Sequence, residues 1–216
     1  MVSSEMHWDG EDNPIVLVFA HGAGAGPQSE FMHSMAAKLA HQGLAVLRFE
    51  FPYWTQVRET GRKRPPNKQD VLQQAMQDVV SKAANGTAQG KPLWLMGKSM
   101  GARVAFQSYD PLHRAGFNVK GCVGLGFPFH PPGKQDKTRT HELINGAAKN
   151  LVIHGSKDPF GKQSWVESQS LAAQLMVEWV AGGNHDLVPN KSTGISANES
   201  WQQVAERVAR FIKEHS

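Results

Sequence analysis

The sequence has few of the features that mark secreted or membrane-spanning proteins. It contains a single cysteine among 216 residues, so no internal disulfide can form, and this residue, Cys122, lies in an apolar run. The first residues show no basic segment followed by an apolar one, and no apolar run is long enough to span a bilayer. We therefore expect a reducing compartment, the cytoplasm, and no membrane partner.

The sequence also lacks a strong excess of charge of either sign. Lys and Arg together number 23 and Asp and Glu 19, which gives a formal net charge of +4. The densest basic stretch, Arg58–Arg64, reads RETGRKR, and no nucleic-acid-binding module accompanies it. We interpret this stretch as a solvated loop and expect no nucleic-acid partner. An anionic substrate is the milder alternative.

Short apolar runs alternate with stretches of helical spacing along the chain. The predicted strands lie at residues 14–21, 44–51, 93–96, 119–127, 150–154 and 175–180. The predicted helices lie at residues 29–42, 69–84, after 99, and at 199–214. Strands that are apolar throughout and separated by helices indicate a mostly parallel sheet covered on both faces. We predict a single α/β domain over residues 14–216 with about six strands, preceded by an N-terminal extension at residues 1–13.

A serine between two glycines stands where the third predicted strand meets a helix. Residues 93–106 read LWLMGKSMGARVAF, so Ser99 is the centre of a Gly-x-Ser-x-Gly pattern. In a nucleophile elbow the strained turn projects the hydroxyl from the sheet, and side chains at the glycine positions would clash. The alternative is a serine that only caps the helix. The strand before it and the helix after it favour a nucleophile.

An acid and a base follow the serine in the order Ser, Asp, His. His185, in GGNHDL just past the last strand, can fold back over the sheet and take the serine proton. Asp158, in GSKDPF after the fifth strand, can orient the imidazole. Asp186 is the rival acid, but adjacent residues rarely present their side chains to each other. We predict Ser99, Asp158 and His185 as the catalytic residues.

The glycine-rich loop after the first strand, HGAGAG at residues 21–26, can supply a hydrogen-bond donor. We predict that the backbone N–H groups of Ala23 and Met100 form an oxyanion hole. The alternative is a phosphate-binding loop, but glycines spaced G-x-G-x-G match neither a P-loop nor the dinucleotide fingerprint. We therefore expect no cofactor and no metal.

Together these residues resemble the α/β-hydrolase superfamily over nearly the whole chain. The segments HGAGAG, LRFEFPYW, GRKRPPN, GKSMGAR and FPFHPPGK resemble a compact branch related to dienelactone hydrolases, which includes bacterial predicted hydrolases and testis-expressed protein 30. The resemblance implies a serine hydrolase without a large cap domain, and about 20 residues between the fourth and fifth strands leave no room for one. Dienelactone hydrolases use a cysteine nucleophile, so Ser99 is a departure. We also expect the first antiparallel strands of larger hydrolases to be missing.

Loops after the second and fourth strands are expected to line an open, partly aromatic cleft. The predicted substrate-binding residues are Gly22, Phe51, Tyr53, Phe129 and His130. The cationic side chains that could make the cleft mouth positive are Arg48, Lys98, Arg103, Lys134 and Arg139. A positive mouth would favour an anionic ester or an acyl-CoA thioester.

We predict a serine hydrolase that cleaves a small-molecule carboxylic ester or thioester through an acyl-enzyme. One alternative is a non-catalytic scaffold that keeps the fold, because the branch is similar to a domain in a subunit of the nonspecific-lethal chromatin complex. Another is a peptidase, although no insert for binding a peptide is visible. The presence of all three candidate catalytic residues favours chemistry, and protein partners stay open.

Overall fold

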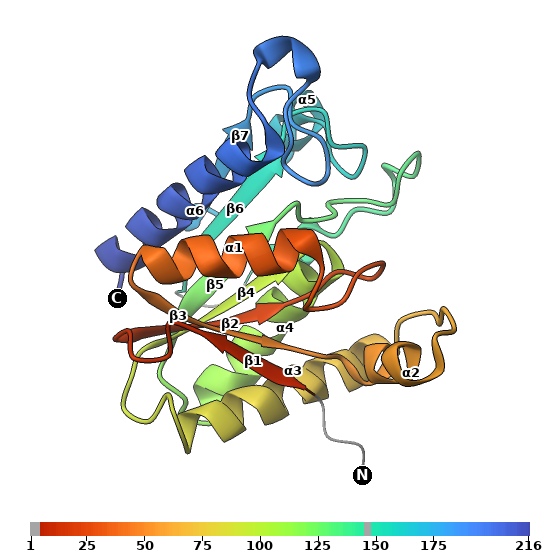
Figure 1. The fold of residues 1–216 in the computed structure, drawn as a ribbon. Coiled ribbons are helices and arrows are strands. Elements are labelled where there is room, and N and C mark those ends of the chain that lie inside the picture. Colours follow the sequence, from red (N-terminus) through yellow and green to blue (C-terminus); the bar gives the residue numbers. More distant parts are fainter. Residues whose placement is uncertain (1–4, 145–147) are drawn as a thin grey trace.

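A single, mostly parallel sheet forms the centre of the molecule (Figure 1). The computed structural model describes residues 5–144 and 148–216. The described strands are β1 (Met6–Asp9), β2 (Ile15–Ala20), β3 (Leu44–Phe49), β4 (Leu93–Lys98), β5 (Val119–Leu125), β6 (Lys149–Gly155) and β7 (Leu175–Val180). They are arranged in the order β1-β3-β2-β4-β5-β6-β7. Neighbouring strands pair in parallel, except that β1 is antiparallel to β3.

Helices cover both faces of the sheet. The described α-helices are α1 (Glu30–His41), α2 (Pro52–Thr60), α3 (Gln69–Ala84), α4 (Met100–Arg114), α5 (Gln163–Glu167) and α6 (Ala197–Glu214). Helices α1 and α6 pack against each other over one face, and α3 and α4 pack together over the other (Figure 1). This is the predicted α/β architecture, with helices on both sides of a buried sheet.

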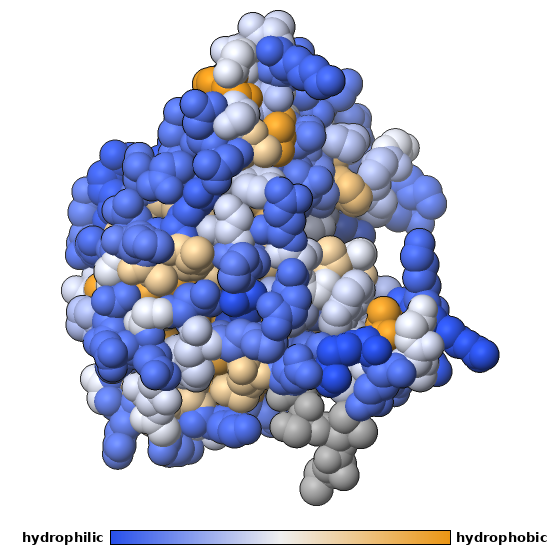
Figure 2. Space-filling view, in the orientation of Figure 1, coloured by the Kyte–Doolittle hydropathy of each residue, from blue (hydrophilic) through white to orange (hydrophobic). Residues whose placement is uncertain are grey.

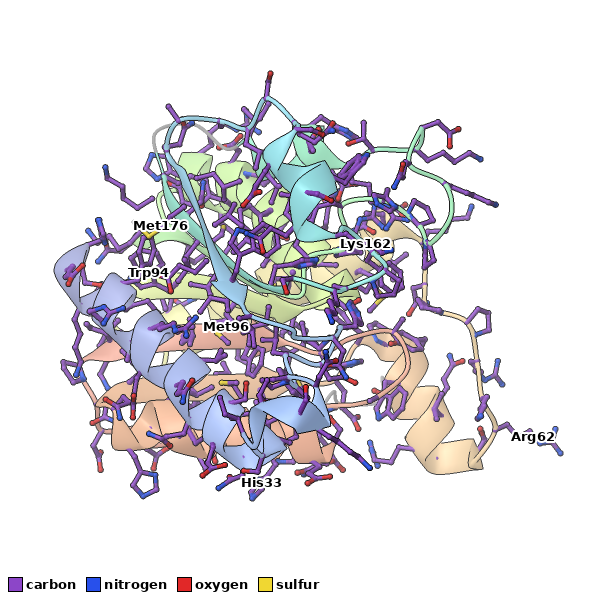
Figure 3. All side chains as sticks on the ribbon, turned by 90° about the horizontal axis from the view of Figure 1, so that it is seen from above. His33, Arg62, Trp94, Met96, Lys162 and Met176 are labelled. Atoms are coloured by element: carbon purple, nitrogen blue, oxygen red, sulfur yellow. The ribbon has the colours of Figure 1, made fainter. Side chains whose placement is uncertain are left out.

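The central strands are apolar throughout because alternate side chains enter two different cores. In β2, Val16 and Val18 pack with α3 and α4, whereas Leu17 and Phe19 pack with α1 and α6. In β4, Trp94 and Met96 lie on the α6 side of the sheet (Figure 3), and the Trp94 ring meets that of Phe211 at 5.7 Å. Burial on both faces explains why periodicity in these strands is hidden in the sequence.

The sheet contains one strand more than the sequence indicates. Residues 6–9, which the sequence places in an N-terminal extension, form β1 and pair antiparallel with β3. The expectation that an initial antiparallel strand would be missing is therefore wrong. This edge strand reads MHWD and is only half-buried, so it has no apolar run to reveal it. Asp9 fixes it by binding the buried Arg48, with Nη2 to Oδ2 at 2.9 Å and Nε to Oδ2 at 3.0 Å.

Helix α2 also departs from the sequence prediction. The basic stretch 58–64 is not a loop throughout, because α2 runs to Thr60 and ends at Gly61, whose φ is +65°. Arg58 lies inside that helix and binds the buried carboxylate of Glu50 at 2.8 Å. Residues 61–68 are irregular, and Arg62 points away from the body of the molecule (Figure 3). The remaining basic residues are therefore solvated as predicted.

The chain forms one domain without a cap. The connection between β5 and β6 contains, in its described part, only the short 3-10 helix η1 (Thr140–Leu143). Hydrophilic residues cover most of the face seen in Figure 2. Within residues 5–144 and 148–216, none of the helices combines the length and the apolar character needed to cross a bilayer.

Candidate active site

Ser99 lies in a strained turn between β4 and α4. Its φ of +53° and ψ of −112° place a non-glycine residue in a conformation that side chains rarely adopt. A Cβ at Gly97 would lie 2.0 Å from the backbone carbon of Gly101, and one at Gly101 would lie 2.3 Å from the carbonyl oxygen of Ala20. The two glycines therefore let β4, α4 and β2 approach closely enough to hold the turn.

Ser99, His185 and Asp158 form one hydrogen-bonded chain. His185 Nε2 lies 2.9 Å from Ser99 Oγ, and His185 Nδ1 lies 2.7 Å from Asp158 Oδ2. Because an ionised carboxylate can only accept, Nδ1 carries the proton and Nε2 is free to accept from the serine hydroxyl. The three side chains follow β4, β6 and β7, whose carboxyl ends meet at one edge of the sheet. Asp186 binds elsewhere, to Lys98 at 3.3 Å.

Asp158 is held as a buried carboxylate. Burial raises its pKa, but the hydrogen bond from His185, the charges of His154 and His185, and the Phe160 backbone N–H outweigh burial and lower the pKa overall. The Phe160 N–H donates to Oδ1 at 2.8 Å, while Oδ2 faces His185. Phe160 also packs its ring against His185, with centroids 4.5 Å apart. This residue, two positions after the aspartate in GSKDPF, was missed by the sequence analysis.

A second histidine touches the same carboxylate. His154, on β6, is fully buried, and its Nε2 lies 3.3 Å from Asp158 Oδ2 without the geometry of a hydrogen bond. Burial lowers its pKa to about 4, so the ring is neutral at pH 7. Rings of Phe129 and Trp179 surround it at 5.1 and 5.8 Å. The sequence gives little sign of this contact beyond a histidine four residues before the acid.

Hydrogen bonds within the loop and from Lys98 fix the loop that carries His185. The side-chain oxygen of Asn184 accepts the backbone N–H groups of Asp186 and Val188 at 2.9 and 3.0 Å. Lys98, next to the serine, donates from Nζ to the His185 carbonyl at 2.7 Å. Its pKa is lowered by burial, an effect that Asp186 partly offsets. Lys98 thus connects the histidine loop to β4, the strand that ends just before Ser99.

The glycine-rich loop lies beside Ser99. Within the described residues, no acceptor binds the backbone N–H of Ala23 or of Met100, and both residues line a cavity next to Ser99. His21 lies behind the loop, where its Nδ1 donates to the Gly22 carbonyl at 2.8 Å and its Nε2 accepts the Phe51 N–H at 3.2 Å. Burial lowers the pKa of His21 to about 4, which keeps it in this neutral form.

Ser99 lines two cavities. The first, of about 320 Å³, is lined by Gly22, Ala23, Gly24, Ala25, Ser29, Phe31, Met32, Lys98, Ser99, Phe160, His185 and Asp186. The second, of about 310 Å³, is lined by Ala23, Pro66, Asn67, Gln69, Leu72, Ser99, Met100, Arg103, Pro128, Arg139 and Phe160. Each is large enough for one organic group. Ser99, Ala23 and Phe160 belong to both.

Only one predicted substrate-binding residue, Gly22, lines either cavity. Phe51, Tyr53, Phe129 and His130 do not, because their side chains are buried in the fold. Tyr53 instead supports the glycine-rich loop, since its hydroxyl proton is shared between the carbonyls of Gly22 and Ala23, each 3.1 Å from the hydroxyl oxygen. Position after a strand indicates nearness to the site but does not tell whether a side chain faces the cavity or the core.

The predicted cationic side chains separate in the structure. Lys98 lines the first cavity, Arg103 and Arg139 line the second, and Arg48 and Lys134 line neither. Arg48 is engaged by Asp9, and Lys134 is exposed. Among residues 5–144 and 148–216, no group of three or more His, Cys, Asp or Glu side chains could hold a metal ion.

Comparison with known proteins agrees with the fold. Residues 13–213 match the family described as alpha/beta hydrolase domain. The chain is similar to the dienelactone hydrolase of Anabaena variabilis, with a TM-score of 0.76, 17% identity, and coverage of 99% of this chain and 93% of that one. It is also similar to a serine hydrolase without a lid from Xanthomonas campestris, with a TM-score of 0.66, 18% identity, and coverage of 94% and 82%. A third similar structure is Est1E of Butyrivibrio proteoclasticus with ferulic acid bound, with a TM-score of 0.71, 14% identity, and coverage of 98% and 95%. The chain therefore belongs to the alpha/beta hydrolase domain family.

Proposed function

We propose that this protein is a serine hydrolase that cleaves a carboxylic ester or thioester of a small molecule through an acyl-enzyme. The observation that carries the proposal is the chain from Ser99 Oγ to His185 Nε2 at 2.9 Å and from His185 Nδ1 to Asp158 Oδ2 at 2.7 Å, built on a strained serine. Similar folds described as a serine hydrolase and a dienelactone hydrolase support it.

In the first step Ser99 Oγ attacks the substrate carbonyl carbon while its proton passes to His185 Nε2. The carbonyl π electrons move onto the oxygen, and the N–H groups of Ala23 and Met100 stabilise the resulting oxyanion. When the oxyanion collapses, the bond to the leaving oxygen or sulfur breaks. His185 then gives its proton to that leaving atom, and an alcohol or thiol departs.

Water completes the reaction. It attacks the acyl carbon while His185 Nε2 takes one of its protons, and collapse of the second tetrahedral intermediate breaks the bond to Ser99 Oγ. His185 returns the proton to the serine, and a carboxylic acid leaves. Asp158 keeps the imidazole in the tautomer that this sequence needs and stabilises the imidazolium. Its depressed pKa keeps it ionised across the neutral range.

His185 acts as a base in the first proton transfer and as an acid when the leaving atom departs. A thioester has a better leaving group than an ester, so its cleavage depends less on proton donation by His185. The site therefore supports both substrates, with thioesters less dependent on protonation of the leaving atom.

The direct test is hydrolysis of 4-nitrophenyl butyrate and of a butyryl thioester by the wild type, Ser99→Ala and His185→Ala. Each variant should lose kcat by about a thousand-fold or more, because the three residues act as a unit. His33→Ala is the matched control, since this histidine lies exposed on α1 (Figure 3) and should leave the rate unchanged. Equal rates in wild type and Ser99→Ala would contradict the proposal.

A further inference from the structure

The two cavities beside Ser99 are not equivalent with respect to the proposed chemistry. His185, which must protonate the leaving atom, lines only the first cavity. Met100, whose N–H faces the proposed oxyanion, lines only the second. An ester placed with its carbonyl at Ser99 therefore directs its leaving group into the first cavity and the rest of its acyl group into the second.

The first cavity offers an apolar surface without net charge. Phe31, Met32 and Phe160 contribute rings and a thioether to its wall. Its two charged side chains, Lys98 and Asp186, lie 3.3 Å apart and neutralise each other. A charged leaving group would lose its hydration there without gaining an opposite charge.

The second cavity has a surplus positive charge. The charge of Arg103 is paired, because its Nε and Nη2 bind both carboxylate oxygens of Glu142 at 2.7 and 2.6 Å. Among the described residues, the Arg139 side chain makes a single hydrogen bond, from Nη1 to the Pro128 carbonyl at 3.2 Å. In the described part of the chain no carboxylate forms an ion pair with Arg139, and no carboxylate side chain lines the cavity. Burial and then the charge of Arg103 lower the pKa of Arg139, and the charge of Glu142, the carboxylate that Arg103 binds, offsets part of this effect.

An amide donor belongs to the same wall. The Nε2 nitrogen of Gln69, the first residue of α3, is buried and has no hydrogen-bond partner within residues 5–144 and 148–216. Buried N–H donors in proteins nearly always have a partner. An arginine with free donors and an amide with a free donor on one cavity wall suit a carboxylate, which accepts from both and binds guanidinium groups in a planar, bidentate way.

We propose that the substrate is an ester or thioester whose acyl part carries a second carboxylate, bound by Arg139 and Gln69, and whose leaving group is apolar. This inference rests on the proposed hydrolase function and adds a substrate class and an orientation to it. The substrate is thus a half-ester or half-thioester of a dicarboxylic acid. The product left after deacylation is the free dicarboxylate.

Three matched esters test both the charge and its position. Monobenzyl glutarate carries the carboxylate on the acyl side, benzyl pentanoate replaces that carboxylate by a methyl group, and 4-carboxybenzyl pentanoate carries it on the leaving group. We expect kcat/KM to be about ten-fold or more higher for monobenzyl glutarate than for benzyl pentanoate, as for a charge-assisted hydrogen bond. We expect the lowest value for 4-carboxybenzyl pentanoate.

Arg139→Gln tests the assigned residue. It should abolish most of the preference, measured as the ratio of kcat/KM for monobenzyl glutarate to that for benzyl pentanoate. Arg139→Lys, which keeps the charge but loses the planar fork, should keep part of it. Arg62→Gln is the matched control, because it removes one positive charge from a solvated loop that faces away from the molecule (Figure 3), and the ratio should stay at the wild-type value.

The outcomes separate this inference from the proposed function. If benzyl pentanoate is cleaved as fast as monobenzyl glutarate, or if 4-carboxybenzyl pentanoate is preferred, the carboxylate site is wrong while the hydrolase function stands. The same holds if Arg62→Gln lowers the ratio as much as Arg139→Gln does, because the effect is then one of overall charge. If none of the three esters is cleaved, both are contradicted. The wild-type preference is measured independently of whether any variant folds.

Discussion

At the scale of single residues, the turn at Ser99 depends on two glycines that have no Cβ atom. Ser99 occupies its left-handed conformation only because Gly97 and Gly101 carry no Cβ where the backbones of β4, α4 and β2 meet. The atoms that a new Cβ would strike belong to the main chain, so no side-chain rotation can relieve the clash. The Gly-x-Ser-x-Gly pattern therefore indicates a packing requirement as well as a candidate nucleophile.

Replacing Gly97 by alanine should destabilise the protein by about 3 kcal/mol, the upper part of the range for overpacking. The added Cβ would lie 2.0 Å from the Gly101 carbon and 2.2 Å from the Ala102 nitrogen. Urea unfolding measures the change. Gly24→Ala is the control, because a Cβ there meets no atom within 4 Å and stability should change by less than about 0.5 kcal/mol. Similar losses in the two variants would contradict this explanation.

At the scale of elements, the site is assembled from loops that follow strands, and each loop is held by side chains from another element. Helix α6 fixes the histidine loop, since Trp201 Nε1 donates to the Asp186 carbonyl at 2.9 Å and Ser200 Oγ to the Leu187 carbonyl at 2.6 Å. Strand β4 holds it from the other side through Lys98. A histidine on a loop thereby keeps a fixed distance from the serine in the turn after β4.

Lys98→Met should lower kcat for ester hydrolysis by roughly ten-fold, because the histidine loop loses its tie to β4 and the proton acceptor is displaced from Ser99. The comparison is with Lys91→Met, just before β4, where Nζ binds the Glu11 carbonyl at 2.8 Å on the surface. Steady-state rates and thermal unfolding of both variants are the measurements. A Lys98→Met enzyme as active as Lys91→Met would show that the contact with the His185 carbonyl does not position the ring.

At the scale of the whole molecule, two buried histidines make stability depend on pH. Burial lowers the pKa of His21 and of His154 to about 4, whereas each would have a pKa near 6.5 when unfolded. Between these values the unfolded chain binds more protons than the folded one. Stability is therefore full above pH 6.5 and falls as the pH drops toward 4, by up to about 1.4 kcal/mol per pH unit for each histidine.

Urea unfolding between pH 7.5 and pH 5 tests this dependence, and His154→Gln should reduce its slope by about one proton. Asp158 does not contribute to the pH dependence of stability in this range. Its pKa is lowered by folding, so the folded and unfolded chains differ in proton binding at Asp158 only near and below the pKa of an unfolded aspartate. A stability that stays constant from pH 7.5 to pH 5, or an unchanged slope in the variant, would contradict a neutral buried His154.

The fold could be predicted largely from local patterns, and the proximity of Ser99, Asp158 and His185 from where the strands end. The apolar runs predicted six strands. Ser99, Asp158 and His185 each follow one of these strands, and parallel strands bring their carboxyl ends to one edge of the sheet. Strand β1 was missed because its sequence contains no apolar run. It lies at the edge of the sheet, where pairing with β3 and the ion pair between Asp9 and Arg48 hold it in place. The cavity walls were mostly missed, since whether Tyr53 faces a ligand or supports a loop depends on long-range packing.

The most direct measurement is the mass of the protein after reaction with a fluorophosphonate, followed by mapping of the modified residue. A serine activated by His185 and Asp158 should take up one label, on Ser99, and Ser99→Ala and His185→Ala should take up none. Asp158→Asn should react more slowly, because the imidazole loses its fixed tautomer. A folded wild-type protein that stays unlabelled, or that is labelled at another serine, would contradict the assignment of Ser99 as the nucleophile.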